Sequence, residues 1–151
     1  MNIFNMAKLT LVISCFVAIN HVTAQKTNKH FNTIKTLLHQ QQVDWNNADI
    51  DAFMEVYWKS DDLQFGGATG ITKGWNNTLN NYKKRYPDKA AMGTLTFKIK
   101  DMTQQSRKVV SLTGSWDLTR NSGDIGGHFI LIWRKIKGKW RIVADHTSAR
   151  P

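Results

Sequence analysis

The sequence has a single cysteine, Cys15, and only two prolines among its 151 residues. One cysteine excludes a disulfide framework within the chain and a zinc site built from cysteines. With so little proline and no low-complexity tract, collagen-like and linker-like chains are excluded as well. Acidic residues are also few, because 11 of them stand against 21 lysines and arginines and leave a formal net charge of +10. Hydrophobic residues make up 41% of the chain, which is enough for the core of one domain of ordinary size.

Long apolar runs are missing too, since the run at residues 9–19 is shorter than the roughly 20 residues of a membrane-spanning helix. Lys8 precedes this run, and Val22, Thr23 and Ala24 follow it at the sites that a signal peptidase reads. Residues 1–24 are therefore predicted to be a signal peptide. Residues 25–151 are predicted to be a single periplasmic or secreted domain with no integral membrane segment. Two alternatives are lipoprotein anchoring at Cys15 and an N-terminal core helix.

The spacing of apolar residues predicts three helices in the first half of this domain. At residues 31–45 and 50–57 the apolar side chains recur three or four positions apart, and Asp49 is the expected N-cap of the second helix. A small hairpin at residues 63–72 has Gly66, Gly67 and Gly70 at its turn. It leads to the third helix at residues 73–85.

In the second half the period of the apolar residues changes to two. Long strands are predicted at residues 95–100, 110–118, 128–136 and 140–148. Helices followed by strands indicate an α+β fold, with three N-terminal helices packed on a curved antiparallel sheet. Strand 128–136 is apolar on both faces, which predicts that the second face contacts another subunit. The alternative is a curled sheet that buries both faces within one chain.

Three segments of the chain carry a family resemblance. They are WNNADIDAFM at residues 45–54, Gly74-Trp75 before the third helix, and GKWRIV at residues 138–143 followed by DHTS at residues 145–148. In this order they resemble the nuclear transport factor 2-like superfamily over nearly all of residues 30–150. The chain looks like the small stand-alone SnoaL-like domains of uncharacterised function. Its last residues are also similar to the association domain of calcium/calmodulin-dependent kinases.

The resemblance implies a cone-shaped fold with a pocket between the sheet and the helices, and a homodimer. Ketosteroid isomerase, scytalone dehydratase and the polyketide cyclase SnoaL share this fold and use Asp, His or Tyr in the pocket. A shared fold does not by itself transfer that chemistry to this chain.

Asp145 and His146 are the candidate catalytic residues. Neighbours on a strand point to opposite faces, and His146 alternates in step with Trp140 and Ile142, which predicts that it points inward. A neutral histidine there could exchange protons near neutral pH, or it could be a structural histidine bonded to a carbonyl. Asp145 would then face outward and pair with Arg134 or Arg141 across strands. If a bulge turned Asp145 inward instead, the apolar surroundings would raise its proton affinity and let it act as a base.

Aromatic residues are the candidate ligand contacts, because rings offer a large apolar surface with a polar edge. The candidates are Tyr57, Trp58, Trp75, Tyr82 and Trp116, and core packing is the alternative reading for each of them. No histidines occur at metal-ligand spacing and no Gly-rich phosphate loop is present, so neither a metal nor a cofactor is expected. A secretory signal also argues against nucleic acid as a partner of the basic surface.

These observations predict a secreted or periplasmic domain that binds a small apolar or aromatic molecule. If the domain is an enzyme, the predicted activity is acid–base catalysis of the isomerase, dehydratase or cyclase type. The alternative is a non-catalytic dimerisation or partner-binding module whose cone is filled by its own rings.

Overall fold

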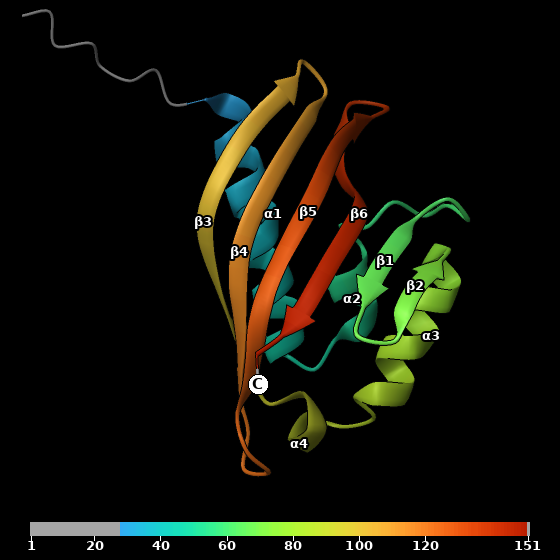
Figure 1. The fold of residues 1–151 in the computed structure, drawn as a ribbon, viewed down its shortest axis with the longest axis vertical. Coiled ribbons are helices and arrows are strands. Elements are labelled where there is room, and N and C mark those ends of the chain that lie inside the picture. The colour runs from blue at the N-terminus through green and yellow to red at the C-terminus, as the bar shows by residue number, and fades with distance from the viewer. Residues whose placement is uncertain (1–27, 151) are drawn as a thin grey trace, which may run out of the picture.

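The computed structural model describes residues 28–150, whose strands form a six-stranded sheet in the order β2-β1-β6-β5-β4-β3. Its long antiparallel strands are β3 (Thr94–Ser106), β4 (Val109–Thr119), β5 (Ile125–Ile136) and β6 (Lys139–Ala149). The hairpin of β1 (Gln64–Gly67) and β2 (Gly70–Lys73) extends the sheet through a parallel pair between β1 and β6. Figure 1 shows the pronounced curvature of the long strands. The predicted α+β fold class is confirmed.

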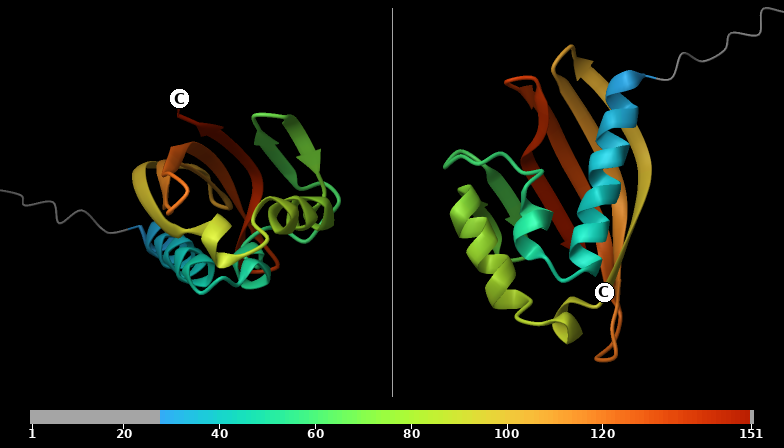
Figure 2. Two further views of the ribbon diagram at one scale, coloured as in Figure 1. Left: turned by 90° about the horizontal axis from the view of Figure 1, so that it is seen from below. Right: turned by 180° about the vertical axis from the view of Figure 1, so that it is seen from behind.

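The helices are α1 (Lys29–Asn46), α2 (Ile50–Met54), α3 (Trp75–Arg85) and the short α4 (Lys89–Met92). All of them precede β3, and Figure 2 shows α1, α2 and α3 on one side of the sheet. This side is called the inner face below, and the opposite side the outer face. Within residues 28–150, no helix combines the length and the apolar character needed to cross a membrane.

Side-chain caps fix where three of these helices begin. The carboxylate of Asp49 accepts a hydrogen bond of 2.8 Å from the Ala52 N–H, which confirms it as the N-cap of α2. Asn28 caps α1 in the same way. Asp88 caps α4, a helix that the apolar spacing did not predict because it is only one turn long.

The hydrophobic core lies between the inner face and the helices. The alternating β5 residues Phe129, Leu131 and Trp133 are buried there against side chains such as Leu38 of α1. On the outer face Ile130 remains 49% exposed. The curled-sheet alternative is therefore wrong for residues 28–150, since the chain does not cover both faces of β5. The predicted signal peptide and Cys15 lie outside the described residues.

Candidate functional site

A cavity of about 580 Å³ opens between the inner face of the sheet, α3 and the β1–β2 hairpin. Aromatic rings make up much of its wall, and they contact one another edge to face. Trp45 packs in this way on Phe53 and on Tyr86, with ring centroids 5.0 and 4.9 Å apart, and Phe53 packs on Tyr82 at 5.3 Å. Phe65 of β1 lies against Tyr82 from the hairpin side. These edge-to-face contacts form a continuous aromatic wall on this side of the cavity.

Among the described residues 28–150, Asp145 is the one carboxylate that lines this cavity, and only 6% of it is exposed. Its Oδ2 accepts a hydrogen bond of 2.7 Å from the Tyr57 hydroxyl, and its Oδ1 accepts one of 2.8 Å from Thr147 Oγ1. Burial raises the pKa of Asp145 from 3.8 to about 6, although both hydrogen bonds act in the opposite direction. A carboxyl group of this kind can change its protonation state close to neutral pH.

The tyrosines beside Asp145 keep their protons. Burial, together with the negative charge of Asp145, raises the pKa of Tyr57 and of Tyr82 well above 10. Both side chains therefore present neutral hydroxyl groups in this part of the cavity. With Thr147, they give the buried carboxylate a polar environment within a wall formed mostly by aromatic and aliphatic side chains.

A β-bulge places Asp145 in the cavity. Ile142 pairs with Trp133 and Ala144 pairs with Ile132, which leaves Val143 as an extra residue on β6. The extra residue shifts the alternation of side chains by one position, so that Asp145 joins the buried side of the strand.

The predicted orientations of Asp145 and His146 were therefore wrong. His146 is exposed and pairs with Ile130 on the outer face. Asp145 points inward and bonds to Tyr57 and Thr147 rather than to an arginine. The bulge on which the second expectation for Asp145 depended is present, and the proton affinity of Asp145 is raised as expected in that case.

Comparison with solved structures identifies the family. An NTF2-like protein of unknown function from Shewanella oneidensis MR-1 is 38% identical in sequence, with a TM-score of 0.76, over 79% of this chain and 98% of that chain. The chain belongs to the NTF2-like family. No family model and no curated protein matches the sequence.

Two more distant structures share the fold of this NTF2-like chain. A ketosteroid isomerase-like protein from Erwinia carotovora atroseptica SCRI1043 is 18% identical, with a TM-score of 0.67, over 82% of this chain and 98% of that one. A putative calcium/calmodulin dependent protein kinase II association domain from Xanthomonas campestris is 14% identical, with a TM-score of 0.60, over 78% of this chain and 86% of that one.

The cavity of this NTF2-like chain brings together some of the predicted aromatic contacts. Tyr57, Tyr82 and Trp116 line it. Trp58 and Trp75 do not. The Trp58 ring instead stacks under the guanidinium of Arg134, and the Trp75 indole N–H donates to the Met54 carbonyl.

Several lining residues were not predicted from the sequence. Phe65 pairs with Asp145 across the parallel β1–β6 contact, which local patterns do not reveal. Thr147 lies two residues after Asp145 and would follow from the bulge. Lys84 and Arg85 line the cavity from the last turn of α3, although a cluster of basic residues in a sequence ordinarily indicates a solvated surface. Within residues 28–150, no His, Cys, Asp and Glu side chains gather in a group that could hold a metal ion.

Proposed function

We propose that the chain binds a small, largely apolar molecule in this cavity, with Asp145 as its polar anchor. The observation that carries the proposal is a buried carboxylate in the wall of a cavity of about 580 Å³ that is otherwise lined mainly by rings and aliphatic side chains. Ligand pockets typically enclose roughly 300–1,000 Å³ and combine an apolar lining with a few polar groups. Both features agree with a binding site.

Asp145 also suits general acid–base catalysis of the isomerase, dehydratase or cyclase type. A pKa of about 6 leaves Asp145 mostly ionised near neutral pH, yet still basic enough to accept a proton from a C–H or O–H group held against it. Tyr57 and Thr147 each donate to one carboxylate oxygen, so both oxygens retain a lone pair for the ligand. The bound molecule would donate to one of these lone pairs.

The alternative is a non-catalytic module whose rings fill the cone. Its rings would have to occupy the space beside Asp145, whereas the aromatic side chains described above lie around the cavity as its wall. The arrangement therefore favours ligand binding over a filled cone.

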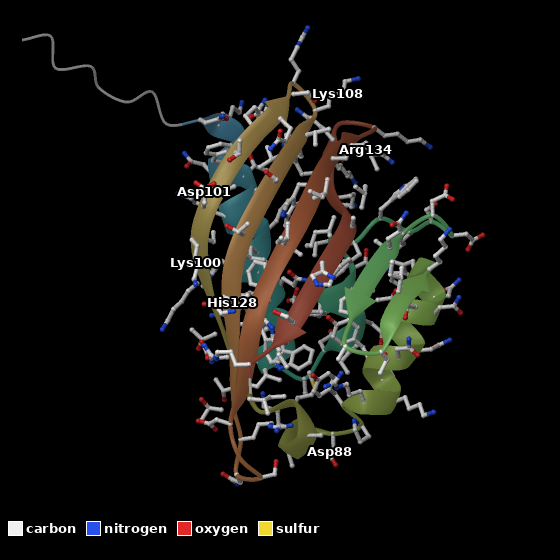
Figure 3. All side chains as sticks on the ribbon, in the orientation of Figure 1. Asp88, Lys100, Asp101, Lys108, His128 and Arg134 are labelled. Carbon is white, nitrogen blue, oxygen red and sulfur yellow. The ribbon has the colours of Figure 1, made fainter. Side chains whose placement is uncertain are left out.

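We also propose that the chain forms a homodimer through the outer face. Figure 3 looks onto this face, with His128 labelled on β5. Ile130 is 49% exposed, and Ile132 and Ile136 are partly exposed on the same face. Burying apolar side chains of this kind against a second copy is favourable.

A thermal-shift screen against steroids, aromatic polyketides and fatty acids tests ligand binding, because a ligand of the native state raises the melting temperature. Two tryptophan variants provide a matched pair. Trp116→Phe changes the cavity wall, whereas Trp75→Phe changes a ring outside it, and each removes one indole hydrogen bond to a carbonyl. We expect a hit whose shift is reduced by Trp116→Phe alone. Equal reductions in both variants, or no shift with any compound, would count against the proposal.

A further inference from the structure

The charges of the cavity wall are separated. Within the described residues, its lining contains three charged side chains: Asp145, Lys84 and Arg85. Asp145 is buried, whereas Lys84 and Arg85 are exposed at the C-terminal end of α3. The two cations therefore lie where the cavity meets the solvent, beside the exposed turn of the β1–β2 hairpin that also lines it.

The positions of the two cations are not explained by ion pairs. Lys83, the preceding residue, pairs with Asp51 at 2.8 Å. Within residues 28–150 neither Lys84 nor Arg85 takes part in a salt bridge. Cations in the last turn of a helix interact favourably with its dipole, but this effect does not require them to line a cavity. Both remain available to an anion at the mouth.

Both ends of the cavity act electrostatically on the aromatic wall, since burial and the Asp145 carboxylate raise the pKa of Tyr82. Against the effect of burial, Arg85 lowers the pKa of Tyr82 and of Tyr86, and its guanidinium lies 5.8 Å from the Tyr86 ring. The aromatic part of the wall thus lies between a cationic mouth and a buried hydrogen-bond acceptor.

We propose that the ligand is an amphipathic organic anion. Its oxyanion headgroup contacts Lys84 and Arg85 at the mouth, its ring-containing body packs against Tyr82 and Tyr86, and a hydroxyl group at its far end donates to Asp145. Arginine pairs with oxyanions through two parallel hydrogen bonds, and the apolar wall suits a rigid hydrocarbon body. This inference rests on the proposed function and narrows it to one class of ligand.

Two series of related compounds test it by calorimetry. The longer series is lithocholic acid, its methyl ester, and 5β-cholanic acid, which lacks the hydroxyl group. The shorter series is 6-hydroxy-2-naphthoic acid, its methyl ester, and 2-naphthoic acid. In at least one series we expect the hydroxy acid to bind more tightly than both its ester and its deoxy analogue. The ester lacks the negative charge that Lys84 and Arg85 would contact, so it should bind roughly three- to tenfold more weakly than the acid.

Paired variants locate the anion. Lys84→Gln with Arg85→Gln should remove the preference for the acid and its dependence on salt, while leaving the affinity for the ester unchanged. The control, Lys83→Gln with Lys89→Gln, removes the same charge outside the cavity and should preserve the preference. Equal binding of acid and ester to the unmodified protein would overturn the anion proposal and leave the proposed function standing. Failure of all six compounds to bind would count against both.

Discussion

The Tyr57 hydroxyl donates a 2.7 Å hydrogen bond to Oδ2 of Asp145, although the two residues are 88 positions apart in the sequence. Both side chains are buried, at 2% and 6% exposure. The bond connects the segment after α2 to β6 and gives the buried carboxylate one of its two donors. The helical layer and the sheet are therefore joined at the proposed site.

Replacing Tyr57 with phenylalanine should destabilise the protein in a pH-dependent way. Hydrogen bonds to charged groups contribute roughly 1.5–3 kcal/mol, so we expect a loss of that size where Asp145 is ionised and a smaller loss where it is protonated. Urea denaturation at about pH 8 and pH 4 measures both values. Tyr86→Phe is the control, since it changes another cavity tyrosine without removing a hydrogen bond to Asp145. Equal losses at both pH values would contradict the prediction.

Asp145→Asn tests the cost of burying the charge. The pKa of Asp145 is about 6 in the folded protein against 3.8 ordinarily, so the folded state holds the proton more tightly. The stability gained from this protonation is fully present below pH 3.8 and is lost as the pH rises through 6.

Relative to Asp145→Asn, the unmodified protein should therefore lose roughly 2.4 kcal/mol between pH 4 and pH 7. Denaturation curves of both proteins across this range measure the difference between their free energies of unfolding. The contributions of all other titrating groups cancel in this difference. A difference that stays constant, or that grows in favour of the unmodified protein as pH rises, would show that Asp145 is not buried as described.

Close backbone contact at Gly127 predicts a large effect of a single methyl group. A Cβ atom there would overlap the Ser148 carbonyl on β6, and backbone atoms cannot move aside cheaply. Gly127→Ala should destabilise the protein by more than about 3 kcal/mol or prevent folding.

Gly67→Ala is the matched comparison, because its Cβ would meet only the Phe65 ring at an ordinary 3.6 Å. We expect a change within about 1 kcal/mol, measured by the same urea denaturation. Similar effects of the two substitutions would argue against the described pairing of β5 with β6 near Gly127.

Ile130→Lys should dissociate the proposed dimer, since a charged group at the centre of an apolar contact is costly to bury. Ile71→Lys is the control. Ile71 is 70% exposed but lies on β2 at the edge of the sheet, away from the outer-face residues. Sedimentation velocity at micromolar concentration should find a dimer for the unmodified protein and for Ile71→Lys, and a monomer for Ile130→Lys. A monomeric unmodified protein would refute the dimer.

Local patterns were sufficient to predict most of the fold. The apolar period indicated the three longer helices and the four long strands, and Asp49 was correctly predicted as an N-cap. The family resemblance agreed with this order of elements. Such features depend on residues that are close in the sequence, where spacing and capping determine the local structure.

The candidate site was less predictable, because a single extra residue in β6 reverses the orientation of every side chain after it. Strict alternation from Trp140 places His146 inside and Asp145 outside, whereas the bulge at Val143 does the opposite. Nothing in the residues 140–148 themselves marks the bulge. The contact of Phe65 with Asp145 likewise depends on a pairing between distant strands.

The titration of the Asp145 carboxyl group tests most directly whether the bulge turns this residue into the apolar cavity. Carbon-13 NMR of aspartate-labelled protein records it, and Asp145→Asn assigns the signal. We expect a midpoint near the pKa of about 6 that burial produces. A midpoint near the ordinary 3.8 would contradict it, because that is the value expected if Asp145 faced water on the outer side of the sheet.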